Sequence, residues 1–142
     1  MRIRLTHYLA SSVLALVMFV VSASGDCTSY GYVQQYYGGD CVGRNPGPDE
    51  VIVFQHTDYN QYERGYCAVL GRGSYAHSYS FKMPNDSVSS IKVGRNVTAY
   101  LYSDACYRGR SEGFHNIWDR RLSDNYIGND STSSIDVFKL LW

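Results

Sequence analysis

Two repeated hexapeptides hold the residues with the clearest capacity for chemistry. The first reads Asn-Asp-Ser-Val-Ser-Ser at 85–90, and the second reads Asn-Asp-Ser-Thr-Ser-Ser at 129–134. Five of the six positions are identical, and the copies lie 44 residues apart. Their amide, carboxylate and hydroxyl groups are hard oxygen donors, which suit calcium and its shell of about six to eight oxygens. The repeat therefore predicts one supersecondary unit used twice, with oxygen-rich loops suited to calcium.

Short strand-like segments surround each hexapeptide and must position it. Apolar residues alternate after both copies, at 91–93 and 135–138, and further strand-like runs lie upstream at 51–54 and 97–102. Glycines and turn residues separate these runs, and residues 116–122 are the best candidate for a short helix. Short strands at this spacing favour an all-β, antiparallel β-sandwich.

The first 25 residues have the pattern of a secretory signal peptide. Arg2 and Arg4 precede an apolar core at 13–21, and small residues follow, so we expect cleavage just before Asp26. The core is short for a membrane span, although an uncleaved anchor is the alternative. We therefore expect a secreted protein with no membrane attachment after signal cleavage.

The remaining 117 residues provide enough chain for one domain with one modest core. Without Arg2 and Arg4 they carry 11 basic and 13 acidic side chains, a formal net charge of −2. This balance gives no electrostatic basis for a nucleic acid or an anionic membrane as partner. We divide the chain into a signal peptide, an N-terminal extension and a domain of two repeats: 1–25, 26–50 and 51–142, with the repeats at 51–94 and 97–142.

Four cysteines, an even number in a chain expected to be secreted, predict two disulfides. They are Cys27, Cys41, Cys67 and Cys106. Of the three pairings, we favour Cys27–Cys41, which would clip the extension, and Cys67–Cys106, which would join the two repeats. The chain has no Cys-x-x-Cys pair to support zinc, and the even count leaves no thiol for catalysis.

No catalytic motif stands out in the sequence. The chain lacks a Gly-x-Ser-x-Gly elbow, a His-Glu-x-x-His motif and a phosphate-binding loop. His56 and Asp58 lie close in sequence, but we interpret them as a loop pair rather than an acid–base couple. We therefore expect that the protein is not an enzyme.

The second repeat resembles a Greek-key motif of the βγ-crystallin superfamily. Tyr102, Tyr107 and Gly109 match the family's hairpin of two aromatics and a glycine, where glycine permits a tight backbone bend. Both hexapeptides match its calcium signature of two Asn or Asp residues, two free positions, Ser or Thr, and Ser. The resemblance covers 51–138 and implies a β-sandwich of two Greek-key motifs.

The first repeat departs from the family's hairpin motif. His56 stands where we expect the first aromatic residue, and Tyr-Glu-Arg-Gly at 62–65 has one residue too many before its glycine. We therefore expect a bulged or longer hairpin in this repeat.

The resemblance implies two calcium sites built reciprocally. Each takes a Ser hydroxyl from one hexapeptide and an Asp side chain with a nearby carbonyl from the other, and a hairpin carbonyl adds to the shell. The donors implied for Ca²⁺ are Asp86, Ser87, Ser89, Asp130, Ser131, Ser133, Thr57 and Ser103. Ser87, Ser131, Thr57 and Ser103 would act through backbone carbonyls, and Ser90 and Ser134 would hydrogen-bond the hairpins. Because Asn, Asp and Ser are also common turn residues, loops that bind no ion are the alternative.

The resulting interpretation is a secreted protein that calcium stabilises. The alternative is a proteinase inhibitor or an antimicrobial, toxin-like protein on the same scaffold, acting through the extension. That extension places Tyr30, Tyr32 and Tyr36 for one face of an added strand and ends in a Pro-Gly-Pro turn at 45–49. The sequence does not specify a protein or carbohydrate partner.

Three Asn-x-Ser/Thr sequons are present in the chain, at Asn85, Asn96 and Asn129. Glycans on Asn85 or Asn129 would crowd the proposed calcium sites. Asn96 is therefore the favoured acceptor.

Overall fold

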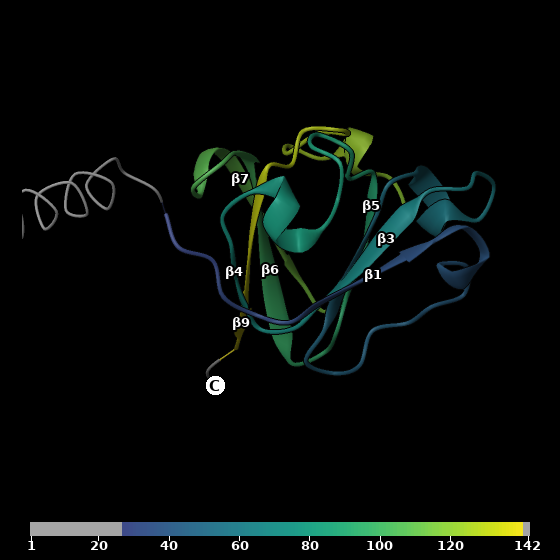
Figure 1. Ribbon diagram of the computed structural model, residues 1–142, viewed down its shortest axis with the longest axis horizontal. Coiled ribbons are helices and arrows are strands. Elements are labelled where there is room, and N and C mark those ends of the chain that lie inside the picture. The colour runs from purple at the N-terminus through teal and green to yellow at the C-terminus, as the bar shows by residue number, and fades with distance from the viewer. Residues whose placement is uncertain (1–26, 141–142) are drawn as a thin grey trace, which may run out of the picture.

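The computed structural model describes residues 27–140, which form two antiparallel β-sheets and no α-helix. One sheet has the strand order β1-β3-β2-β5-β8 and the other has the order β4-β9-β6-β7 (Figure 1). The strands are β1 (Val33–Tyr37), β2 (Val51–Phe54), β3 (Tyr66–Leu70), β4 (Gly73–Tyr75), β5 (Ser90–Val93), β6 (Val97–Asp104), β7 (Arg108–His115), β8 (Trp118–Asp119) and β9 (Ser134–Lys139). Short 3₁₀ turns connect some of them, at Gly38–Asp40, Thr57–Asn60, Ser78–Phe81 and Leu122–Asp124. The expected all-β architecture is confirmed, whereas the predicted signal peptide lies outside the described residues.

The two repeats exchange their third strands. β4, from the first repeat, pairs with β9 in the four-stranded sheet, and β8, from the second repeat, pairs with β5 in the five-stranded sheet. Each sheet therefore contains strands from both repeats, which is the Greek-key arrangement of a sandwich. Neither repeat can bury its apolar face without the other.

Alternation along β2 explains its continuous apolar run. Val51 and Val53 point into the main core between the sheets, whereas Ile52 and Phe54 belong to a second cluster with Cys41, Cys67 and Val69. Because β2 is buried on both faces, all four of its residues are apolar rather than alternating with polar ones.

The N-terminal extension adds an edge strand to the five-stranded sheet. Its strand β1 pairs with β3 at the sheet edge, and Figure 1 shows the two strands side by side. Earlier in the chain, Tyr30 forms a bridge with Ser74 of β4, so the extension reaches both sheets. The added strand is confirmed, and its Tyr36 packs against the second apolar cluster. Tyr30 and Tyr32, which we expected on the same strand face, precede β1 and are exposed.

The predicted disulfide pairing is wrong. Cys27 is bonded to Cys106, with their Cα atoms 5.3 Å apart, and Cys41 is bonded to Cys67 at a Cα separation of 5.9 Å. The turn after β1 folds back over β3 and brings Cys41 to Cys67, while the bridge at Tyr30 keeps Cys27 near the hairpin that follows β6. Both bonds therefore join the extension to the repeats, and neither bond joins the two repeats to each other.

The helix predicted at 116–122 is also wrong. Residues 118 and 119 form β8, in which Asp119 pairs with Ile91 and Trp118 with Lys92. A 3₁₀ turn begins only at Leu122, whose buried side chain contributes to the main core. Pairing at the sheet edge overrides the local helical preference of this segment. Within residues 27–140, no helix has the length and apolar character needed to span a bilayer.

Candidate calcium centre

The two hexapeptides meet at one end of the sandwich. The loop at 85–90 leads into β5 and the loop at 129–134 leads into β9, so each enters a different sheet. The backbone amide of Asp130 donates a hydrogen bond to the carbonyl of Val88 at 3.1 Å, which joins the two loops directly. Asp86 and Asp130 both have a φ of 52°, a left-handed conformation that Asp tolerates better than most residues. The two loops therefore share one local geometry.

The side chains of the two loops interact reciprocally. Ser89 donates a hydrogen bond to Asp130 Oδ1 at 2.9 Å, and Ser133 donates one to Asp86 Oδ1 at 3.0 Å. Each contact joins the fifth position of one hexapeptide to the second position of the other. Two oxygens at such a separation can both reach one calcium ion, for which Ca–O distances are about 2.3–2.6 Å.

Ser90 and Ser134 perform the structural role that was predicted for them. Ser90 donates to the carbonyl of His56 at 2.7 Å and accepts from the amide of Tyr59 at 3.1 Å. Ser134 donates to the carbonyl of Asp104 at 2.6 Å and accepts from the amide of Tyr107 at 3.0 Å. Each serine therefore closes the hairpin of its own repeat.

These matched bonds correct the predicted hairpin of the first repeat. Because Tyr59 corresponds to Tyr107, the first aromatic position belongs to Phe54 and not to His56. The rings of Phe54 and Tyr59 lie 5.5 Å apart, and those of Tyr102 and Tyr107 lie 5.8 Å apart, both edge-on. With this alignment, the position that corresponds to Gly109 is occupied by Gln61 rather than by glycine.

Asn60 stabilises the first hairpin, which has no glycine at the position equivalent to Gly109. It has a φ of 60° and is buried, and its side chain accepts from the amide of His56 and donates to the carbonyl of Tyr66. Asn adopts the left-handed conformation at low cost, so the longer hairpin closes without a glycine.

A depression of about 400 Å³ lies beside the Ser89–Asp130 pair. Its lining residues come from both loops and from the first hairpin: Gln55, His56, Thr57, Glu63, Asp86, Ser87, Ser89, Asn129 and Asp130. Asn129 Oδ1 is buried and has no hydrogen-bond partner among the described residues. An orphaned buried oxygen among carboxylate and hydroxyl groups fits a hard cation.

The sequence analysis did not predict that Glu63 lines this depression. Its carboxylate lies 3.5 Å from Nδ1 of His56, whereas Asp58, the partner that the sequence suggested for His56, pairs with Arg120 at 2.7 Å. Alignment of the first hairpin on Phe54 and Tyr59 would have placed Glu63 in the longer loop beside the site.

The two predicted hairpin donors, Thr57 and Ser103, do not occupy equivalent positions in their hairpins. Thr57 lines the depression, and by the matched serine bonds its counterpart in the second repeat is Ala105. Ser103 instead corresponds to Gln55, two positions earlier. Its hydroxyl accepts a hydrogen bond from the amide of Arg110 at 2.9 Å.

Two tyrosines next to the second loop have raised pKa values. Burial, together with the carboxylate of Asp136, raises the pKa of Tyr102 to about 12, and the same two causes raise the pKa of Tyr107. Tyr102 donates a hydrogen bond to Asp136 Oδ2 at 3.2 Å. Both phenols therefore stay neutral at physiological pH.

Comparison with known proteins identifies the superfamily of this chain. No protein-family model and no curated protein matches the sequence. A solved structure concerned with the evolution of the eye lens beta-gamma-crystallin domain fold aligns with a TM-score of 0.64 and 24% identity, over 78% of this chain and 100% of its own. A betagamma-crystallin domain from Flavobacterium johnsoniae is 28% identical with a TM-score of 0.52, over 63% of this chain and 93% of its own. The protein belongs to the βγ-crystallin superfamily.

Another neighbour of this crystallin contains a metal. A double mutant of clostrillin in complex with nickel aligns with a TM-score of 0.53 and 20% identity, over 63% of this chain and 98% of its own. This likeness concerns the fold alone. The candidate donors of the present crystallin therefore rest on its own geometry.

Proposed function

We propose that this crystallin is a secreted calcium-binding protein whose fold is stabilised by two reciprocal calcium sites. The reciprocal contacts Ser89–Asp130 and Ser133–Asp86 carry the proposal. Each contact joins the two repeats, so an ion held there would tie together strands that enter different sheets. Its role would be binding and structural rather than catalytic.

The proposed donors fall into two sets of hard oxygens. The first set is the Ser89 hydroxyl, the Asp130 carboxylate and the carbonyls of Ser131 and Thr57. The second set is the Ser133 hydroxyl, the Asp86 carboxylate, the carbonyl of Ser87 and a hairpin carbonyl near Ser103 or Ala105. A bound calcium ion would supply the positive charge that these oxygen donors coordinate. With one Asp in each set, affinity should be modest, roughly 10⁻⁶ to 10⁻³ M.

An ion that binds only the folded chain raises stability by mass action. At a calcium concentration about 100 times Kd, one site contributes about 2.7 kcal/mol. The stabilisation should be specific to calcium, because magnesium requires a tighter, near-octahedral shell.

Thermal unfolding of the oxidised mature protein in EDTA, millimolar calcium and millimolar magnesium tests this function. We expect a rise in Tm on the order of 10 °C with calcium alone. Ser89→Arg combined with Ser133→Arg should abolish the rise, whereas Ser111→Arg, on an exposed position of β7, should preserve it. An unchanged Tm, with the wild type folded in both EDTA and calcium, would contradict the proposal.

Secretion is a separate part of the proposal and needs its own test. The chain expressed from Met1 in secreting cells should appear in the medium with Asp26 as its first residue. N-terminal sequencing of the secreted material checks this. A protein retained on the membrane with residues 1–25 intact would contradict it.

A further inference from the structure

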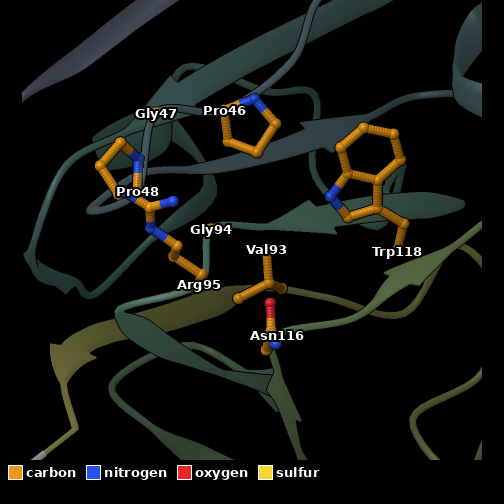
Figure 2. A pocket seen from close by; sticks show the side chains of 8 residues that line it. All are labelled: Pro46, Gly47, Pro48, Val93, Gly94, Arg95, Asn116 and Trp118. Carbon is orange, nitrogen blue, oxygen red and sulfur yellow. The ribbon is translucent and has the colours of Figure 1, made fainter.

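A second hollow lies where the extension meets the repeats, and it shares no lining residue with the depression beside the hexapeptides. It measures about 320 Å³, at the lower end of small-molecule pockets. The proline turn at 46–48 forms one wall, and Arg95, Asn116 and Trp118 line the rest. Figure 2 shows these side chains around the hollow, with Val93 and Gly94 near its centre. We call it the Trp118 hollow.

Backbone hydrogen bonds hold the walls of the Trp118 hollow. The amide of Asn96 donates to the carbonyl of Pro48 at 2.9 Å, and the amide of Val93 donates to the carbonyl of Ile117 at 3.0 Å. Gly94 lies so close to the turn that an added Cβ would stand 2.3 Å from the carbonyl oxygen of Gly47. Prolines and close packing fix the walls before any ligand arrives, which lowers the entropic cost of binding.

The polar side chains of the hollow have unused binding capacity. Within residues 27–140, the side chains of Arg95 and Asn116 make no hydrogen bond or ion pair, and both are exposed. Arg95 offers a planar fork of donors that matches a carboxylate, and Asn116 offers an amide that can both donate and accept. Both side chains are therefore available to a ligand.

Trp118 provides a flat apolar surface beside these polar groups. It is 49% exposed, and the Lys92 ammonium lies 4.6 Å from its ring centre. Lys92 is itself buried and fixed by the carbonyl of Arg44 and the side chain of Asn45, both at 3.0 Å. The indole therefore has a set position, and the charged residue that lines the hollow with it is Arg95.

We propose that the Trp118 hollow binds an acidic sugar residue of a glycan. An apolar face of the sugar ring would stack on the Trp118 indole, its carboxylate would pair with Arg95, and a hydroxyl would bond to Asn116. One guanidinium matches the single charge of a carboxylate. A nucleoside phosphate would bring a second charge, whereas Arg95 is the single charged residue among those that line the hollow and Lys92 is buried and bonded to Arg44 and Asn45. The inference does not depend on calcium binding.

Binding is tested on the oxidised full mature chain, with NMR of the Trp118 indole N–H as the readout. The probes are trigalacturonate and sialyllactose, each with its neutral counterpart, the methyl ester and lactose. We expect saturable shifts of the Trp118 signal with at least one acid, and roughly tenfold or weaker binding of its neutral counterpart. Adenosine monophosphate should bind more weakly than that acid.

Arg95→Gln supplies the decisive variant because Arg95 has no structural partner. It should reduce binding of the acidic probe to the level of the neutral counterpart, whereas Arg72→Gln, which removes an equal charge from an exposed position after β3, should leave binding unchanged. The proposal is overturned if neither acid binds, if acid and neutral probes bind equally, if Arg95→Gln has no effect, or if adenosine monophosphate binds best.

Discussion

The hydroxyl of Ser89 lies 2.9 Å from the carboxylate of Asp130, a residue 41 positions later in the chain and on the other repeat. The mirror contact, between Ser133 and Asp86, has almost the same length. Each repeat thus completes the polar loop of the other, just as each supplies a strand to the other's sheet. In the proposed calcium sites, as in the two sheets, each repeat therefore contributes part of a structure that the other repeat completes.

Ser90→Ala should destabilise the protein without removing a calcium site. The substitution leaves the carbonyl of His56 and the amide of Tyr59 without their partner, which costs about 1–3 kcal/mol. Urea unfolding measures the loss, and calorimetric titration should still give two ions. Ser123→Ala, on an exposed 3₁₀ turn, is the control. Loss of one ion with unchanged stability would contradict the structural role of Ser90.

Glu63→Gln should weaken only the site that contains Ser89 and Asp130. The Glu63 carboxylate lines that depression, and the hairpin of the second repeat is shorter. Because the side chain is 72% exposed, solvent screens its charge and the loss should be roughly threefold to tenfold in affinity. Calcium titration resolves the two sites. Asp40→Asn removes an exposed charge from the extension as control, and an equal effect there would assign the loss to net charge.

Tyr75→Phe should reduce the sensitivity of the fold to alkali. Tyr75 is buried, it donates to the carbonyl of Gly71 at 2.6 Å, and burial raises its pKa to about 12. Because the folded chain holds this proton between about pH 10 and pH 12 while the unfolded chain loses it, stability falls as pH rises through that window. Removing the phenol should reduce the slope by up to about 1.4 kcal/mol per pH unit.

Urea unfolding between pH 8 and pH 12 measures the slope for Tyr75→Phe. Tyr62→Phe, at a position 81% exposed, is the matched control and should keep the wild-type slope. Part of the slope should remain in Tyr75→Phe, because the pKa of Tyr102 is also raised to about 12. Equal slopes for both variants would show that Tyr75 does not couple to folding.

Removal of each disulfide should destabilise the chain to a different degree. Cys27–Cys106 spans 79 residues and Cys41–Cys67 spans 26, so the first constrains the unfolded chain more. Losses of about 2–5 kcal/mol are expected, with the Cys27→Ser, Cys106→Ser pair worse by about 1 kcal/mol. Urea unfolding of both paired variants gives the comparison. Non-reducing peptide mapping that found Cys27–Cys41 would contradict the connectivity.

The repeat pattern and strand alternation were sufficient to predict the sandwich, and the tyrosines of the extension predicted the added strand. The roles of Ser90 and Ser134 were implied by the resemblance to the βγ-crystallins. The disulfide pairing was not predictable, because Cys41 reaches Cys67 only after the extension folds back over the sheet. The first hairpin was misaligned because Gly65 offered a glycine, whereas the chain uses the left-handed Asn60 instead. The helix at 116–122 failed because pairing with β5 outweighs local propensity.

Calcium stoichiometry in two matched double variants tests the central claim most directly. Asp→Gly suits both left-handed Asp positions and removes the carboxylate. Ser89→Arg with Asp130→Gly damages one reciprocal site, so titration calorimetry should find one ion per chain. Ser89→Arg with Asp86→Gly damages both sites, so it should find none. The reverse result, none in the first variant and one in the second, would mean that each hexapeptide binds its own ion and that the sites are not reciprocal.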